Sequence, residues 1–221
     1  MKELLHDKYS LIIHGPPGVG KREFCIDLAG YQLGKKSTVL YVTTERAPNS
    51  IKEVARNIGA VFVGERLFFV DYASWSTSKK TGWLDDRMKI ICLQNPSSLR
   101  DISMAVKTIS QTSTGRLNVF FDSLSPLFLY NNDEKVVQFI QTLIAQLRSE
   151  GGSIAVTLQE GVHPPSTFNS LMYMVDGYIQ LRFLDDGGAI KRQLRVHHLH
   201  GKRVQPEWRD LEITENGLEV L

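Results

Sequence analysis

The sequence is poor in the features that mark secreted and membrane-spanning proteins. Its 221 residues include only two cysteines, which are too few for a disulfide framework. Cys25 and Cys92 both lie in apolar stretches and are expected in the core rather than as nucleophiles. No apolar run approaches the roughly 20 residues of a membrane span, and residues 1–10 lack the apolar segment of a signal peptide. A reduced, cytoplasmic protein without a membrane partner is therefore expected.

An excess of charge of one sign is also absent. The 26 Lys and Arg residues nearly balance the 24 Asp and Glu residues, for a net charge of +2. Composition therefore offers no overall electrostatic case for nucleic acid or a membrane surface as partner. Hydrophobic residues form 42% and charged residues 23% of the chain, as in globular rather than disordered proteins. No linker-like segment interrupts residues 1–221, which predicts a single domain.

A glycine-rich stretch near the N-terminus has the spacing of a phosphate-binding loop. The stretch "GPPGVGKREFC" puts Gly15, Gly20 and Lys21 at the spacing G-x-x-x-x-G-K of a Walker A loop. An apolar, strand-like run precedes the loop and a helical pattern follows it. Backbone N–H groups of such a loop point inward, and the helix N-terminus adds its positive dipole end, so the segment is suited to phosphate. The residues predicted to bind a nucleotide here are Gly15, Pro16, Pro17, Gly18, Val19, Gly20, Lys21, Arg22 and Glu23.

Position 22 departs from this motif. A Ser or Thr usually follows the lysine, because its hydroxyl holds Mg²⁺, whereas this chain has Arg22. The guanidinium could take part of the space and charge role of the metal, or it could swing out and pair with Glu23. One direct metal ligand is lost in both cases. ATP or ADP is the expected ligand, and the motif leaves the need for Mg²⁺ open.

Strand-like and helical segments alternate along most of the chain, which predicts an α/β fold of three layers, a mainly parallel sheet flanked by helices on both faces. Strands are expected at residues 9–15, 37–45, 66–73, 88–94, 116–123 and 153–160. Helices are expected at residues 21–34, 49–59, 96–112 and 133–151, with Asn49 or Ser50 capping the second and Pro96 in the first turn of the third. Residues 74–87 are expected to form a surface loop. From residue 176 the pattern becomes hairpin-like and predicts an antiparallel C-terminal extension.

Polar side chains follow three of the expected strands. Glu45, Asp122 and the pair Gln159 and Glu160 each come directly after an apolar run. Because parallel strands end at a common edge, where ligands bind in such sheets, these side chains are expected to meet. ATP hydrolysis needs an acid near Mg²⁺ and a group that orients water. Asp122 is then the Walker B acid, holding Mg²⁺ through water, Glu45 a base for the attacking water, and Gln159 or Glu160 a sensor of the γ-phosphate.

The order of these motifs resembles the RecA superfamily and is most similar to its KaiC-like branch in archaea and bacteria. The resemblance covers nearly the whole chain, from the lysine loop through "TTE", "FFDS" and "TLQE" to "VDGYIQL" and "LEITENGLEVL". It implies a RecA-like P-loop ATPase fold, with Glu45 as the water-activating acid and Asp122 as the Walker B acid. It also implies that ATP binds between neighbouring subunits of a ring or filament.

The chain departs from that pattern at three places besides Arg22. Glu45 is followed by Arg46 where the family usually has a second acid. Where the family carries a lysine and an arginine that reach the neighbour's γ-phosphate, "VHHLHGK" has His198 and His200, which are only partly protonated near neutral pH. The glycine-rich segment before the first strand is reduced to residues 1–10, which leaves a monomer, a dimer or a larger homo-oligomer open. These departures predict a regulatory or signalling module that binds ATP and hydrolyses it weakly or not at all.

Two alternatives stay open. Intact Lys21, Glu45 and Asp122 are compatible with an active oligomeric ATPase of the RecA type, and such an ATPase could also bind single-stranded DNA in recombination or repair. Residues 161–170, at the place of the family's DNA-contacting loop, contain no Lys or Arg. A better candidate for DNA is the stretch in which two Trp residues flank two Lys residues, although a surface loop or a partner-docking patch is the favoured interpretation. These four residues are Trp75, Lys79, Lys80 and Trp83.

The histidine-rich stretch of the late strand could also suggest a metal site. Strand alternation would place His198 and His200 on one face and His197 on the other. No cysteine or acidic residue is close in sequence, so a solvated or interface strand face is favoured over a metal centre.

Overall fold

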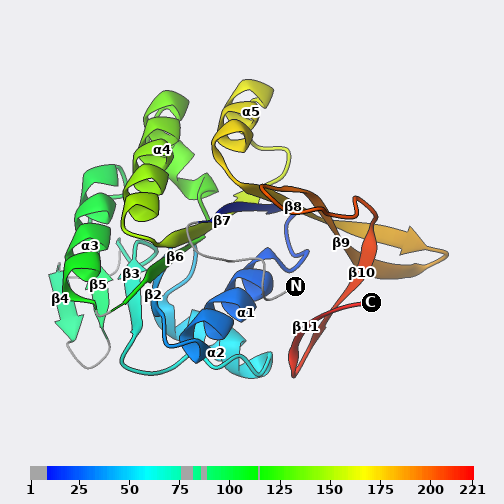
Figure 1. Ribbon diagram of the computed structural model, residues 1–221, viewed down its shortest axis with the longest axis horizontal. Helices are drawn as coiled ribbons and strands as arrows, with labels where there is room; N and C mark the ends of the chain where they lie inside the picture. Colours follow the sequence, from blue (N-terminus) through cyan, green and yellow to red (C-terminus); the bar gives the residue numbers. More distant parts are fainter. Residues whose placement is uncertain (1–8, 76–81, 86–88, 114) are drawn as a thin grey trace.

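A mixed sheet runs through the molecule in the strand order β11-β10-β9-β8-β1-β7-β6-β2-β3-β5-β4 (Figure 1). The computed structural model describes residues 9–75, 82–85, 89–113 and 115–221. The strands are β1 (Ser10–Gly15), β2 (Thr38–Thr43), β3 (Leu67–Asp71), β4 (Gly82–Asp85), β5 (Ile90–Cys92), β6 (Leu117–Asp122), β7 (Ser153–Gln159), β8 (Gly177–Asp186), β9 (Ala189–Leu199), β10 (Arg209–Thr214) and β11 (Gly217–Val220). The helices are α1 (Lys21–Gly34), α2 (Pro48–Asn57), α3 (Leu99–Thr112), α4 (Asp133–Ser149), α5 (Pro165–Met174) and the short 3₁₀ helix η2 (Ser125–Leu129).

The sheet has a parallel centre and antiparallel flanks. Strands β8, β1, β7, β6, β2, β3 and β5 pair in parallel with their neighbours. The hairpin partners β8 and β9, then β10 and β11, continue one side antiparallel, and β4 closes the other side against β5. The predicted α/β class, with its mainly parallel sheet and antiparallel C-terminal extension, is confirmed.

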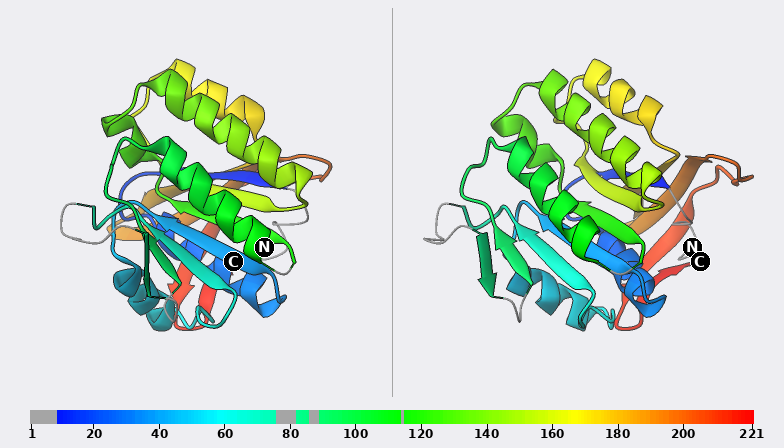
Figure 2. Two further views of the ribbon diagram at one scale, coloured as in Figure 1. Left: turned by 90° about the vertical axis from the view of Figure 1, so that its left-hand side faces the viewer. Right: turned by 60° about the vertical axis from the view of Figure 1, so that its left-hand side comes forward.

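Helices cover both faces of the parallel centre, as expected. Helices α1 and α2 lie on one face, while α3, α4 and α5 lie on the other (Figures 1 and 2). Each face has its own buried cluster, one built around α1 and α2 and the other around α3 and α4. Helix α4 follows its sequence pattern closely, because the apolar stripe that predicted it is buried. Asn132 caps the helix by accepting a hydrogen bond from the Lys135 N–H at 3.0 Å. Cys25 and Cys92 are both buried, as expected of core residues.

Helix starts differ from expectation at two places. Helix α2 begins at Pro48 after Ala47, so neither Asn49 nor Ser50 caps it. Helix α3 begins at Leu99, where the Ser98 hydroxyl accepts from the Asp101 N–H at 3.2 Å, and Pro96 therefore precedes the helix. At α3 the proline was recognised but its position relative to the first turn was wrong, whereas at α2 the role of Pro48 in the first turn was missed.

Three elements were not predicted, of which the short 3₁₀ helix η2 is one. Part of the expected surface loop at residues 74–87 forms β4, an edge strand antiparallel to β5. Residues 165–170, in the segment at the place of the family's DNA-contacting loop, form the first part of helix α5, which begins at Pro165. Polar composition conceals β4, because an edge strand needs only a few buried side chains.

The end of β9 also differs from a regular strand. Tyr178 pairs with His198 but Ile179 pairs with Val196, so the register shifts at His197, and β9 ends at Leu199 before His200. The regular alternation expected for these histidines is therefore interrupted at His197, although His198 and His200 are both exposed. No helix in the described ranges combines the length and the apolar character needed to cross a membrane.

Candidate functional site

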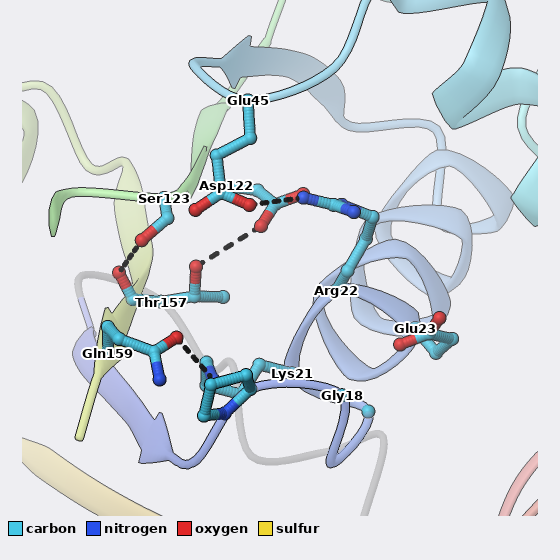
Figure 3. A pocket seen from close by; sticks show the side chains of 11 residues that line it. Gly18, Lys21, Arg22, Glu23, Glu45, Asp122, Ser123, Thr157 and Gln159 are labelled. Atoms are coloured by element: carbon cyan, nitrogen blue, oxygen red, sulfur yellow. Dashed lines mark hydrogen bonds and ion pairs between the residues drawn. The ribbon is translucent and has the colours of Figure 1, made fainter. Parts of the chain in front are cut away.

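The carboxyl ends of the central strands bring the predicted residues together. Register places Gly15 of β1 opposite Gln159 of β7, and Thr43 of β2 opposite Asp122 of β6. The loop after β1 leads directly into α1, so Lys21 and Arg22 start the helix at the same edge. Figure 3 shows the resulting arrangement, in which Arg22, Asp122 and Glu45 converge from one side and Lys21 and Gln159 from the other.

The loop pocket, as we call the hollow at this edge, has a volume of about 190 Å³. That is below the roughly 300–1,000 Å³ of pockets that enclose a whole small molecule. It is therefore sized for the phosphate end of a nucleotide rather than for the base as well. Its lining residues are Pro17, Gly18, Gly20, Lys21, Arg22, Glu23, Glu45, Asp122, Ser123, Thr157 and Gln159.

The loop depends on glycine at two positions. Gly18 and Gly20 have φ of 74° and 106°, in the left-handed region that favours glycine. A Cβ on Gly20 would also lie 2.8 Å from Ile213 Cδ1 in β10, so the C-terminal extension packs against the loop. Gly20 is the N-cap residue of α1. Since glycine has no side chain, nothing from the cap residue competes for the N–H groups of the first helical turn.

The other loop residues support the pocket without lining it. The Val19 side chain is fully buried in the core. Gly15 and Pro16 act through their carbonyl oxygens, each of which accepts a hydrogen bond from Lys21 Nζ at 2.7 Å. The same ammonium donates to Gln159 Oε1 at 3.3 Å. Burial lowers the pKa of Lys21, while the nearby Glu45 and Asp122 carboxylates oppose that shift.

Arg22 turns inward to the two predicted acids rather than toward Glu23. Its Nε donates to Asp122 Oδ2 and its Nη2 to Glu45 Oε2, both at 2.6 Å. Burial opposes the charge of Arg22, but Asp122 and Glu45 raise its pKa above the usual value for arginine. Figure 3 shows Glu23 on the far side of the first helical turn. Of the two orientations open from the sequence, the structure adopts the one that fills the space between the acids.

Asp122 is almost fully occupied by hydrogen bonds. Its side chain is 4% exposed. Besides Arg22, Oδ2 accepts from the Tyr41 hydroxyl at 3.1 Å, and Oδ1 accepts from Thr157 Oγ1 at 3.2 Å. Sequence reasoning missed Tyr41 and Thr157. The available signal was polar side chains inside otherwise apolar strands, and Thr157 lies two residues before Gln159 and so on the same face of β7.

The other polar residues predicted at the strand ends, Glu45, Gln159 and Glu160, differ in their positions. The Glu45 side chain is 41% exposed and lines the loop pocket. Gln159 lines it too, and its N–H donates to Ser125 Oγ at 2.9 Å. Glu160 is exposed, and its N–H donates to the Gly15 carbonyl at 3.0 Å. Gln159, unlike Glu160, therefore lines the loop pocket.

The predicted histidines lie elsewhere in the same subunit. His197, His198 and His200 line a second hollow of about 490 Å³ together with Arg148 and Asp176. We call it the histidine pocket. His197 Nε2 lies 2.8 Å from Gln180 Oε1, and its ring stacks on Tyr178, whereas His198 and His200 are exposed. No group of three or more His, Cys, Asp or Glu in the described ranges has the arrangement of a metal site.

The aromatic patch considered for DNA is only partly within the described residues. Trp75 is 37% exposed, and its ring meets Tyr130 edge-on at 6.2 Å. Lys79, Lys80 and the side chain of Trp83 lie outside the described residues. The patch therefore stays a prediction.

A parallel sheet whose first strand runs through a glycine loop and a lysine into a helix, with acids at the ends of two neighbouring strands, defines a P-loop protein with a RecA-like fold. The chain matches a family model described as "ATPase: KaiC" over residues 3–221, and it belongs to the KaiC family of ATPases. It is thus a RecA-like, nucleotide-binding ATPase domain. No curated protein matches the chain.

Members of this family generally bind ATP or ADP with Mg²⁺. The residues present here do not fit that ion in the observed arrangement. Mg²⁺ demands near-octahedral oxygen ligands at about 2.0–2.1 Å, yet the position of the usual hydroxyl is held by Arg22, and a guanidinium already contacts both candidate acids. A divalent cation would have to share this space with a fixed positive charge.

Proposed function

We propose that this protein is a regulatory or signalling module that binds ATP or ADP and hydrolyses it slowly or not at all. The observation that carries the proposal is the double contact of Arg22 with Asp122 and Glu45, at 2.6 Å each. Binding and hydrolysis depend on different parts of the loop pocket, so one can persist while the other declines.

The parts needed for binding are in place. Backbone N–H groups at the start of α1 and the helix dipole attract phosphate oxygens. Lys21 is held over the mouth of the loop by carbonyl oxygens of Gly15 and Pro16, and a phosphate oxygen is a stronger acceptor for an ammonium than a neutral carbonyl. These groups support a nucleotide held by its phosphates, with the base outside the small pocket.

The parts needed for hydrolysis are compromised. A base for the attacking water must have a free carboxylate oxygen in reach of the water, and one Glu45 oxygen is engaged by Arg22. A cation supplied by a neighbour accelerates phosphoryl transfer by about 10³–10⁵. The positions where the family resemblance implies such cations are His198 and His200, which supply charge less reliably than lysine and arginine.

A paired assay of binding and turnover tests the proposal. We expect the wild-type protein to bind ATP or ADP in calorimetric titration while steady-state ATP hydrolysis stays near background. Arg22→Ser restores the hydroxyl and frees Glu45, so it should raise hydrolysis, and adding Glu45→Gln should abolish that gain. Wild-type turnover near the roughly 10 s⁻¹ that is typical of enzymes, lost in Glu45→Gln, would contradict weak hydrolysis.

A further inference from the structure

We infer that Arg22 serves as a built-in cation in place of Mg²⁺, so that the loop pocket binds nucleotide phosphates without a divalent metal. This inference rests on the proposed function, since it assumes that the pocket takes a nucleotide. It adds that the metal requirement of the site has been replaced by a side chain.

Position is the first argument. Arg22 stands in the first turn of α1, where the motif puts the metal-binding hydroxyl. Its guanidinium contacts one oxygen of Asp122 and one of Glu45, and Figure 3 shows both carboxylates beside it. Asp122 is also the residue that the Walker motif assigns to the metal. The guanidinium thus takes the ligands that a metal ion would otherwise share.

Charge is the second argument. The titratable side chains that line the pocket are two cations, Lys21 and Arg22, and three acids, Glu23, Glu45 and Asp122. Their formal charge is −1, and without the arginine it would be −2. Nucleotide phosphates are polyanions, so some cation must offset the acids before phosphate can approach. Arginine offers a charge that does not dissociate at any physiological pH.

Geometry is the third argument. A guanidinium has five N–H donors in a planar fork that matches phosphate oxygens. One donor to Asp122 and one to Glu45 leave further donors that can reach a phosphate without breaking either contact. The Asp122 carboxylate is also held by Tyr41 and Thr157, so the arginine has a buried, oriented anchor.

Competition with Mg²⁺ is the consequence. A metal ion entering this space must push the guanidinium away from a carboxylate that is 4% exposed, or sit beside it as a second cation. Both cost free energy, because like charges repel strongly where water is excluded. Nucleotide affinity should therefore be insensitive to Mg²⁺ in the wild type and should become sensitive when the arginine is removed.

Calorimetric titration of the full chain with ADP and with ATP, each in excess Mg²⁺ and in EDTA, tests the inference. For the wild type we expect the two Kd values of each nucleotide to agree within about threefold, and for Arg22→Ser we expect binding in EDTA at least about tenfold weaker than in Mg²⁺. Arg22→Lys keeps the positive charge but lacks the planar guanidinium. Its ratio of the Kd in EDTA to the Kd in Mg²⁺ should therefore lie between those of the wild type and Arg22→Ser. Arg46→Ser is the matched control, because it removes an exposed arginine next to Glu45 and should behave as the wild type.

The outcomes separate the two proposals. Wild-type binding that is about tenfold or more tighter with Mg²⁺ than with EDTA would overturn Arg22 as a metal substitute and leave nucleotide binding intact. An Arg22→Ser protein that binds equally well in both conditions would overturn it as well. Absence of wild-type binding to either nucleotide would overturn the proposed function itself. Because the wild-type comparison alone can decide against the inference, it does not depend on the variants folding.

Discussion

The loop pocket and the histidine pocket each contain an ion pair between an arginine and an aspartate, and the two pairs differ in how deeply they are buried. In the loop pocket the paired side chains of Arg22 and Asp122 are 20% and 4% exposed. In the histidine pocket the paired side chains of Arg148 and Asp176 are 47% and 20% exposed. The charged pair of the loop pocket is thus largely buried. In the histidine pocket His198 and His200 are exposed at the surface. Loss of one charged partner should therefore cost more free energy in the loop pocket than in the histidine pocket.

Removing one partner from each ion pair is the most severe test of this contrast. Asp122→Ala leaves Arg22 partly buried with only Glu45 as carboxylate partner and should lower the free energy of unfolding by about 3 kcal/mol. Arg148→Ala acts on a half-exposed pair and should cost less than about 1 kcal/mol. Urea unfolding of both variants measures the difference. Equal losses would show that the two pockets do not differ in this way.

Two glycines of the loop sharpen the comparison, because one of them also joins the loop pocket to the C-terminal extension. Gly20→Ala combines a left-handed φ with a Cβ only 2.8 Å from Ile213 Cδ1, whereas a Cβ on Gly18 would meet nothing within 4 Å. Left-handed strain alone costs roughly 1–2 kcal/mol, and the contact should add to it at position 20. We therefore expect Gly20→Ala to lower Tm and weaken nucleotide binding more than Gly18→Ala does. The reverse order would mean that β10 moves aside without cost.

A pH series provides the most local test. His14, one residue before the loop, is 8% exposed, and its Nδ1 lies 3.2 Å from the Tyr178 hydroxyl. Burial, with a contribution from the Lys21 charge, lowers the pKa of His14 to about 4 from a usual value of 6.5. The unfolded chain then binds the proton more readily, so His14 contributes stability that is present above pH 6.5 and lost as pH falls toward 4.

His14→Phe should flatten the decline of unfolding free energy in that pH window, measured by urea titration at several pH values. Phe keeps an aromatic ring against Phe168, which lies 4.8 Å from the His14 ring. A decline as steep in His14→Phe as in the wild type would assign the acid sensitivity to other groups.

Much of the fold could be predicted because it depends on local patterns. The alternation of apolar runs and helical stripes predicted the parallel centre, and the shift to hairpins predicted the antiparallel extension. Element ends were less accurate, as at Pro96, since a proline favours the start of a helix without specifying its exact turn. Strand β4 and helix α5 were missed because their sequences carry little apolar periodicity, and their existence depends on pairing and packing with distant elements.

The candidate site divides in the same way. By itself the sequence determined that Lys21, Glu45, Asp122 and Gln159 meet at one edge, because loop spacing and parallel strand ends follow from chain order. Only the tertiary structure decided where Arg22 points. A long, flexible side chain turns toward whichever carboxylates lie in reach, and Asp122 is 100 positions away along the chain. Pairing between β2 and β6 brings that carboxylate beside α1, and the arginine then closes on it rather than on its own neighbour Glu23.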